Sequence, residues 1–382
     1  MLKALFISRC TPSESGYGTA RRGVTLLKAL AKHYRLSLLL GPELRADLSF
    51  SPEKIPVPLD QVRIAGNPPE GPAPTSMKEY QDNLRSTYQH DSFDLIFVFR
   101  MDSLLLSEFL LNRNCRYILD LDELDSLRKF RIADLLEKMG RLREAAQERR
   151  QGKLMRVLEC QKLPRFQSIF VSSTVEQSNV RRLGFDSCEV VPNNYPQTAP
   201  LPPRNSSRPF VFLFIGALLY PPNEDAVLFF ALNVFPRLRQ LTSEPVAFHV
   251  AGIGNNPRLD CLRYLEGVTV LGRVPDVRPA YENADVAVVP LRAGAGTRIK
   301  ILEAFAHEKP VLSTPLGAEG LEVTDDGELL LRDDAPSLAQ ACLELMQQPG
   351  LRDRLARAGR AFFVKNHREE IILDRLADLV AP

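Results

Sequence analysis

Short apolar runs alternate with longer segments of helical character along the chain, and the alternation occurs in two successive series. The apolar runs of the first series lie at 4–7, 36–40, 95–99, 117–119 and 169–171, and those of the second at 210–215, 247–251, 268–271, 286–289 and 311–313. The candidate helices between them are 18–32, 75–89, 102–112, 223–240 and 297–307. Strand–helix alternation is typical of parallel βαβ units. We therefore predict an α/β protein with two doubly wound parallel-sheet domains.

A proline-rich segment separates the two series. Six prolines lie within 192–209, where they disfavour both a helix and a central strand. The chain of 382 residues also exceeds what one hydrophobic core ordinarily supports. We predict a first domain over 1–198 and a second over 199–365. A further stretch, 52–74, has seven prolines and is expected to be an exposed loop of the first domain.

Charge and apolar content narrow the class of protein. A formal net charge of +2 argues against a dedicated nucleic-acid binder. The longest apolar run has eleven residues, fewer than the roughly 20 of a membrane-spanning helix, and the N-terminal apolar run is too short for a secretory signal. The six cysteines and five histidines show no metal-ligand spacing. We expect a cytoplasmic protein without a protein-built metal site.

The charge is unevenly distributed along the chain. Residues 128–165 contain 12 Lys and Arg against 5 Asp and Glu, a local net charge of +7. One interpretation is a solvated helical face. The other is a landing surface for anionic lipid, at the inner face of a membrane, or for a phosphorylated acceptor.

Glycine-rich turns follow several of the predicted strands. Ligands of doubly wound sheets bind at the carboxyl ends of the strands, and glycines there let backbone N–H groups approach an anion. The glycines concerned are Gly16, Gly18, Gly216, Gly252 and Gly254. Each turn is also explained as a tight strand–helix connection. Asn223, after the Gly216 turn, can simply cap a helix.

The turn at 294–297 carries the strongest signal. It delivers Thr297 as the candidate N-cap of a helix. The first helical turn then holds Arg298 and Lys300, and the second holds Glu303. Cations are disfavoured at a helix N-terminus by about 0.3–1 kcal/mol each, so two of them suggest a bound anion such as a diphosphate. The alternative is a surface salt bridge between Lys300 and Glu303, which their apolar neighbours disfavour.

In this region the chain resembles the retaining GT-B glycosyltransferases of glycosyltransferase family 4. The matching stretches are 281–290, 294–306, 309–314 and 317–321. Weaker similarities, at 16–18, 171–173, 191–193, 216, 252–254 and 271–274, extend over most of the chain. The resemblance implies a GT-B architecture, in which two Rossmann-like domains face each other across a cleft. It also implies that a C-terminal helix within 366–382 packs back on the first domain.

The resemblance implies that the second domain holds most of a nucleotide-sugar donor. The residues expected to bind it are Gly16, Gly18, Gly216, Gly252, Gly254, Arg273, Val274, Gly296, Thr297, Arg298, Lys300 and Glu303. Among them, Glu303 is expected to bind the ribose, and the turn 296–298 to approach the phosphates. The base is expected at 273–274, and Gly16 is expected to face the phosphates and sugar.

Two features of the family are absent from this chain. The family often has a second glutamate, which contacts the transferred sugar, where this chain has Ala295. It also places an arginine and a lysine after the first strand of the second domain, and 217–221 contains neither. Arg298 and Lys300 can replace these cations, and we predict that they stabilise the departing diphosphate.

An acidic run follows the predicted strand at 117–119. The family often places a histidine or aspartate near here, beside the acceptor. Asp122 is the predicted residue, with Asp120 and Glu123 as alternatives. Such a carboxylate could orient the acceptor hydroxyl or take its proton. The competing interpretation is that Asp122 or Asp125 caps a helix.

The resemblance implies transfer of a sugar from a nucleoside diphosphate to a hydroxyl with retention of anomeric configuration. The acceptor is a saccharide, a lipid-linked group or a protein, as in polysaccharide, glycolipid or glycoconjugate synthesis. No metal or organic cofactor is expected. Two alternatives remain open: a sugar-nucleotide epimerase of the same architecture, and a non-catalytic protein that binds a nucleotide sugar or a partner.

Overall fold

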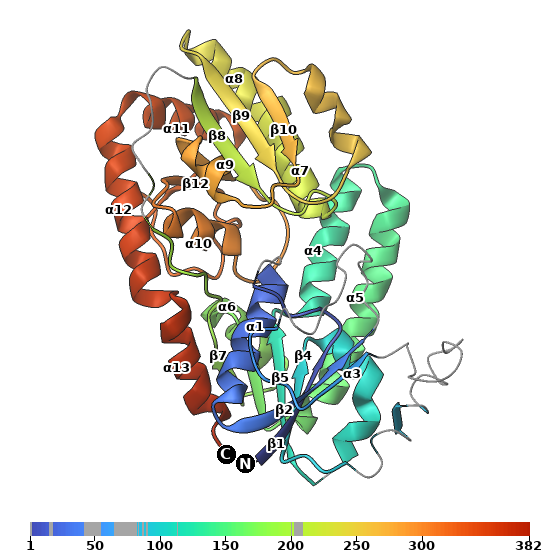
Figure 1. The fold of residues 1–382 in the computed structure, drawn as a ribbon. Helices are drawn as coiled ribbons and strands as arrows, with labels where there is room; N and C mark the ends of the chain where they lie inside the picture. The colour runs from blue at the N-terminus through green and yellow to red at the C-terminus, as the bar shows by residue number, and fades with distance from the viewer. Residues whose placement is uncertain are drawn as a thin grey trace. The chain divides into compact units, whose positions relative to one another are not determined.

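The structure is a computed structural model (Figure 1). It describes residues 2–14, 18–41, 55–64, 82, 84, 85, 88, 91–112, 114–199, 201 and 209–382, with the backbone alone at 105–107 and 112. Two compact units share these residues. Unit 1 comprises Met1–Ser126, Gly152–Asn193 and Glu369–Pro382, and unit 2 comprises Leu127–Gln151 and Asn194–Arg368. Most of the helix 75–89 and most of the loop 52–74, both expected from the sequence, lie outside the described residues.

The division into units differs in two places from the domains expected from the sequence. The chain passes into unit 2 after Asn193, five residues before the expected boundary at 198/199. Unit 2 also contains Leu127–Gln151, which the expected division placed in the first domain. The C-terminal segment Glu369–Pro382 belongs to unit 1.

Unit 1 is built on a seven-stranded sheet of order β3-β2-β1-β4-β5-β6-β7, in which every pairing is parallel. The strands are β1 (Leu2–Ser8), β2 (Tyr34–Leu40), β3 (Gln61–Ile64), β4 (Leu95–Phe99), β5 (Arg116–Asp122), β6 (Ser168–Val171) and β7 (Cys188–Val190). The central strands are runs of Leu, Ile, Val and Phe because helices cover a doubly wound sheet on both faces. The strand order reverses between β1 and β4, which is where such sheets bind ligands.

Unit 2 contains a six-stranded sheet of order β10-β9-β8-β11-β12-β13, again with parallel pairings throughout. Its strands are β8 (Phe210–Ile215), β9 (Val246–Ala251), β10 (Val268–Gly272), β11 (Val286–Val289), β12 (Val311–Ser313) and β13 (Leu330–Leu331). All ten strands predicted from apolar runs are confirmed. The sequence did not reveal β3, β7 and β13, which are short edge strands. The expectation that 52–74 is a loop is wrong at β3.

The helices follow the predicted alternation. Those of the first half are α1 (Gly18–Ala31), α3 (Met101–Ser107), α4 (Asp125–Lys138), α5 (Leu142–Lys162) and α6 (Thr174–Arg181). Those of the second are α7 (Pro221–Phe229), α8 (Phe235–Leu241), α9 (Arg278–Glu282), α10 (Ile299–Ala306), α11 (Ala335–Gln347), α12 (Pro349–Asn366) and α13 (Glu369–Val380). A π-helical segment, Phe230–Val234, joins α7 to α8. No helix in the described ranges is both long and apolar enough to cross a membrane.

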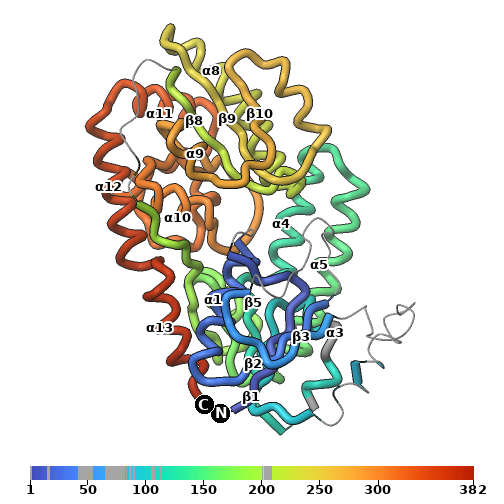
Figure 2. Tube along the Cα trace, viewed as in Figure 1, coloured from blue at the N-terminus to red at the C-terminus, as the bar shows by residue number. Residues whose placement is uncertain are grey.

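Helix α13 returns to unit 1 and packs beside α1 (Figure 2). Ile372, Leu376 and Val380, spaced four residues apart, are buried in the core of unit 1. The ammonium of Lys28 in α1 donates to Glu369 at 2.6 Å, and the hydroxyl of Tyr34 donates to the Val380 carbonyl at 3.0 Å. The last helix is therefore part of the first unit's core.

Candidate functional site

Two glycine turns meet at the carboxyl ends of β8 and β9 in unit 2. Gly216 follows β8, and its N–H donates to the carbonyl of Ala251, the last residue of β9, at 3.0 Å. A Cβ atom on Gly252 would lie 1.7 Å from the Gly216 carbonyl oxygen, so no residue with a side chain fits there. The structure thus brings Gly216 and Gly252 into direct contact.

The neighbouring turn extends this edge of the sheet. The N–H of Gly252 donates to the carbonyl of Gly272 at the end of β10, at 2.8 Å. Gly254 has φ +97°, and a Cβ there would lie 2.7 Å from the side chain of Leu219. Arg273, directly after β10, is exposed, while Val274 packs partly buried against the core.

Helix α10 begins one residue later than the sequence suggested. Its N-cap is Arg298, with φ −85° and ψ 93°, and no side chain makes a capping hydrogen bond. The prediction that Thr297 is the N-cap is therefore wrong; Thr297 is buried in the turn before it. Lys300 is the second residue of the helix, and Glu303 follows one turn later.

The Arg298 guanidinium lies against the glycine turn that precedes it. Its Nη1 donates to the carbonyl of Gly296 at 2.7 Å and also to that of Ala295. Gly294 has φ +121°, a backbone conformation that favours glycine, and a Cβ there would lie 2.9 Å from Arg298 Nη2. The Nε and Nη2 atoms are buried without a hydrogen-bond partner in the described part of the chain. Buried donors of this kind are costly, so they favour an anion beside them.

Lys300 reaches back to the Gly216 turn. Its Nζ donates to Asn223 Oδ1 at 2.7 Å, lies 4.2 Å from the centre of the Phe214 ring, and would be 2.9 Å from a Cβ on Gly216. Burial, and then the charge of Arg298, lower the pKa of Lys300 to about 7, while Glu303 opposes the shift. Nearby acidic groups therefore do not fully compensate the positive charge of the Lys300 ammonium.

Asn223 does not cap α7 as the simpler interpretation of that turn proposed. The N-cap is Tyr220, and Asn223 is the third helical residue. Its Nδ2 donates to the carbonyl of Ala217 at 2.9 Å, which leaves Oδ1 directed at Lys300. The asparagine thus fixes the lysine at the carboxyl end of β8.

Glu303 is held from the side of α9. Its Oε1 accepts a hydrogen bond from the Tyr281 hydroxyl at 3.1 Å. Tyr281 is buried and stacks on His307 at 4.6 Å between ring centres. Burial, and then the charge of Glu303, raise the pKa of Tyr281 well above its usual value, so the phenol remains a hydrogen-bond donor.

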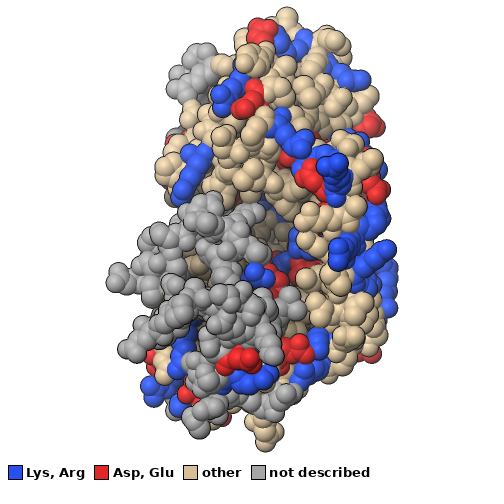
Figure 3. All heavy atoms as spheres, turned by 90° about the vertical axis from the view of Figure 1, so that its right-hand side faces the viewer, with Lys and Arg blue, Asp and Glu red and all other residues tan. Residues whose placement is uncertain are grey.

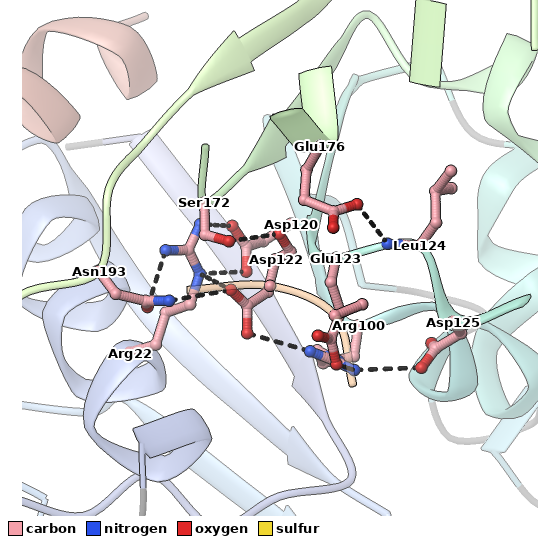
Figure 4. A network of polar contacts seen from close by, with 12 residues as sticks. Arg22, Arg100, Asp120, Asp122, Glu123, Leu124, Asp125, Ser172, Glu176 and Asn193 are labelled. Atoms are coloured by element: carbon pink, nitrogen blue, oxygen red, sulfur yellow. Dashed lines mark hydrogen bonds and ion pairs between the residues drawn. The ribbon is translucent and has the colours of Figure 1, made fainter. Parts of the chain in front are cut away.

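In unit 1, Asp122 lies in a network of ion pairs at the ends of β4 and β5 (Figure 4). Its Oδ2 accepts from Arg100 at 3.0 Å and its Oδ1 from Asn193 at 3.1 Å. Arg100 also donates to Glu123 at 3.2 Å and to Asp125 at 3.1 Å. Both Arg100 (φ +70°) and Asp122 (φ +61°) have left-handed backbones, which cost about 1–3 kcal/mol each and which these contacts maintain.

Asp120 is committed to a separate buried ion pair. It accepts two hydrogen bonds from Arg22, at 2.8 and 2.6 Å, and both side chains are buried. Burial raises the pKa of Asp120, while Arg22 opposes this shift. Arg22 also donates to the Val191 carbonyl and to Asn193. The pair therefore ties β5 to the segment after β7.

Two glutamates accept hydrogen bonds from backbone N–H groups at the start of α4. The N–H of Leu124 donates to Glu176 at 3.2 Å, and the N–H of Ser126 donates to Glu159 at 2.9 Å. Burial raises the pKa of Glu159. Gly18, also predicted to bind the donor, is the first residue of α1 in this unit, and Gly16 lies outside the described residues.

Residues 209–348, which contain β8–β13 and α10, match the family model of glycosyl transferases group 1. No curated protein matches the chain in sequence. Among solved structures, the sucrose-phosphate synthase of Thermosynechococcus elongatus superposes with a TM-score of 0.74 at 16% identity, covering 99% of this chain and 98% of that one. Anabaena HepE, solved in complex with UDP and glucose, gives 0.72 at 14% identity over 100% and 99%. The architecture is GT-B.

The lipopolysaccharide outer core galactosyltransferase WaaB has the same architecture, with a TM-score of 0.60 at 13% identity over 99% of this chain and 98% of that one. In this GT-B chain, the matched region contains most of the residues predicted to bind the donor. The structure brings Gly216, Gly252 and Lys300 together there, and Arg298 lies against the turn at 294–296. Glu303 follows Lys300 on the same helix.

Sequence reasoning missed two arginines that contact this region. Arg131 in α4 donates to the Gly294 carbonyl at 2.9 Å, and Arg141, between α4 and α5, donates to Glu224 in α7 at 3.0 Å. Both lie in the basic segment that was interpreted as a solvated or membrane-facing helix. No local pattern marks them, because their partners are 163 and 83 residues away in the chain.

Proposed function

We propose that the chain is a retaining glycosyltransferase of glycosyltransferase family 4, which moves a sugar from a nucleoside diphosphate to a hydroxyl. The observation that carries the proposal is the pair of under-satisfied cations at the start of α10. Lys300 lies beside Gly216, which contacts Gly252, and Arg298 lies against the turn before α10. Both cations belong to the region that matches glycosyl transferases group 1. A diphosphate would meet the charge of both.

The donor would lie along this edge of the sheet. Its diphosphate binds Lys300 and the start of α10, where the helix dipole also favours an anion. Glu303, already oriented by Tyr281, accepts hydrogen bonds from the ribose hydroxyls. The base lies toward 273–274, at the end of β10. The solved complexes of Anabaena HepE with UDP and with UDP-glucose support this choice of ligand class.

In the proposed reaction, the bond between the anomeric carbon and the diphosphate oxygen breaks, and the leaving oxygen keeps the electron pair. The acceptor oxygen forms the new bond on the same face of the sugar, and its proton passes to an oxygen of the departing diphosphate. Lys300 and Arg298 stabilise the negative charge that grows on the diphosphate, and being fixed in advance they need little reorganisation. In this proposal they supply the positive charge without a metal ion or other cofactor.

Asp122 is the proposed acceptor-side carboxylate. Arg100 and Asn193 fix its two oxygens, and a carboxylate has about four acceptor positions, so it can still accept a hydrogen bond from a hydroxyl. Its fixed position suits orientation of the acceptor. Transfer activity that survives in Asp122→Asn would remove it from the chemistry.

A panel of UDP, GDP and ADP sugars, starting with UDP-glucose, tests the proposed function. Slow hydrolysis of one donor, or transfer to an added acceptor with the α or β configuration retained, supports it, and activity in EDTA supports the metal-free reaction. An epimerised donor would indicate the epimerase alternative. Binding without turnover would indicate a non-catalytic protein, and inversion of configuration would overturn retention.

We further propose that α5 contacts anionic membrane, so that a lipid-linked acceptor is within reach. Most cations of the segment 128–165 have acidic partners, such as Arg149 with Asp134 and Glu137. Three others have no ion-pair partner among the described residues and lie on one exposed face of α5 with two exposed apolar side chains. These five residues are Arg143, Arg150, Lys153, Leu154 and Val157. Figure 3 shows Lys and Arg side chains gathered near mid-height at the right-hand edge of the face it draws.

Vesicles of phosphatidylcholine with and without phosphatidylglycerol test this contact. Replacing Arg143, Arg150 and Lys153 by Gln should weaken binding to the anionic vesicles about a hundredfold, since each charge near the surface contributes about 1 kcal/mol. Arg149→Gln is the matched control, because Arg149 is already paired. Equal vesicle binding by the two variants would show that this face of α5 is a solvated helix surface and does not contact the membrane.

A further inference from the structure

Most of α4 and the first half of α5 form an antiparallel helical pair that belongs to unit 2. In the sequence this pair lies more than forty residues before the rest of the unit, which begins at Asn194. Arg131 in α4 is the side chain that reaches the glycine turn before α10. Its Nη1 donates to the Gly294 carbonyl at 2.9 Å, and its two Nη atoms bind both oxygens of Glu319, Nη2 to Oε1 at 3.0 Å. One guanidinium thus joins the turn to the segment after β12.

The segment after β12 also contacts Val289 and Leu291, which directly precede the glycine turn. The hydroxyl of Thr314 donates to the Leu291 carbonyl and accepts from the N–H of Gly317 at 2.9 Å. A Cβ on Gly317 would lie 2.5 Å from the Val289 carbonyl, so this approach requires glycine. Thr314 therefore holds the chain just before the turn, at Leu291, and Arg131 holds the turn itself, at Gly294.

A second group of contacts fixes the helical pair beside the Gly216 turn. Arg141 donates to Glu224 at 3.0 Å, and their side chains are only 12% and 4% exposed. Three buried apolar residues of the pair pack with Tyr220, at the start of α7; they are Ile132, Leu136 and Ala145. The helical pair is thus anchored on both glycine turns that the donor is proposed to use.

Three successive carbonyls of the turn accept hydrogen bonds from arginines. Arg131 binds the carbonyl of Gly294, and Arg298 binds those of Ala295 and Gly296. Because a peptide unit is planar and trans, the N–H that follows each carbonyl points in the opposite direction. The arginines therefore set the direction of the N–H groups of residues 295–297, the groups that would meet a phosphate.

We propose that Arg131 is a positioning residue for the phosphate-binding turn 294–297. It acts through the Gly294 carbonyl and does not touch the donor. The inference rests on the proposed function for its catalytic consequence, but the ordering of the turn is a property of the chain without ligand. The helical pair of α4 and α5 is accordingly part of the donor site.

Amide hydrogen exchange on the full-length chain without ligand tests the ordering. Arg131→Gln should speed exchange of the amides at 295–297 about tenfold or more, since a charge-assisted hydrogen bond is lost. Arg149→Gln, which removes an exposed ion pair of the same helical pair, should leave it unchanged. Glu319→Gln keeps the bond from Arg131 to Gly294 and should have a smaller effect. Equal exchange in the Arg131 and Arg149 variants, or equal effects of the Arg131 and Glu319 variants, would overturn the proposal.

Kinetics with the donor found by the sugar panel test the consequence. Misplaced phosphate-binding groups should lower kcat about tenfold to a hundredfold in Arg131→Gln with a smaller rise in KM, because orientation matters most in the transition state. A loss confined to KM, or one explained by a lower melting temperature, would contradict positioning. If the parent binds no nucleotide, the proposed function fails, whereas the exchange measurement still decides whether Arg131 orders the turn.

Discussion

The charge of Lys300 offers a direct test of the site, because its environment without donor disfavours the charged form. Burial, followed by the charge of Arg298, lowers its pKa to about 7, against 10.5 for an ordinary lysine. Between these two pH values the unfolded chain binds more protons at this position than the folded chain does. The free energy of unfolding should therefore rise with pH from about 7 to 10.5, and fall as the pH is lowered through that range.

Lys300→Met keeps the length of the side chain and removes its charge. Each pKa unit corresponds to about 1.4 kcal/mol, so the ammonium costs several kcal/mol at pH 7. The variant also loses the hydrogen bond to Asn223 and the contact with the Phe214 ring, together worth about 1–3 kcal/mol. We expect the variant without donor to be more stable than the parent by about 1–3 kcal/mol at pH 7, with less gain in stability on going to pH 9.

Donor binding should show the opposite effect. A diphosphate beside Lys300 favours the ammonium, so binding above pH 7 should take up as much as one proton, and affinity should fall up to tenfold per pH unit. Lys300→Met should abolish this proton uptake. If Lys300 stabilises the leaving group, the variant should also lower kcat about 10²- to 10³-fold, with a smaller rise in KM.

Three measurements decide the matter: chemical denaturation at pH 7 and 9, calorimetry of nucleotide binding in buffers of different ionisation enthalpy, and saturation kinetics. Lys365→Met is the control, because Lys365 is an exposed residue of α12 in the same unit and should change stability by less than about 0.5 kcal/mol. A Lys300→Met variant that is less stable than the parent, yet binds nucleotide with the same affinity and proton uptake, would refute the reasoning.

Three further substitutions have defined outcomes. Glu303→Ala should weaken nucleoside diphosphate binding about tenfold to a hundredfold by calorimetry, and unchanged affinity would remove Glu303 from the ribose site. Gly252→Ala should destabilise the fold by at least about 3 kcal/mol in urea denaturation, since its Cβ would lie 1.7 Å from the Gly216 oxygen; a smaller loss would show that the turns can separate. Asp122→Asn should lower the free energy of unfolding by about 2–4 kcal/mol, because Arg100 loses a charged partner; unchanged stability would show that the network does not depend on the charge of Asp122.

The sequence by itself determined the repeated βα pattern and the position of every long strand. Buried strands such as β1 and β8 need apolar residues on both faces. A few consecutive apolar residues are therefore enough to predict such a strand. The same holds for the glycine turn before α10, where the spacing of Arg298, Lys300 and Glu303 is local. The edge strand β3 escaped detection because an edge strand is paired on one side only and needs no apolar run.

Only the tertiary structure decided which side chains meet at the candidate site. Asn223 binds Lys300 from 77 residues away, and Arg131 binds Gly294 from 163 residues away. Neither contact leaves a periodic or compositional trace, because it depends on how the sheet and the helical pair are packed rather than on neighbouring residues. The local net charge of +7 at 128–165 is the same in the sequence whether these cations face solvent or bind carbonyls and carboxylates. Packing separated the two cases: Arg131 acts inside unit 2, while Arg150 remains exposed on α5.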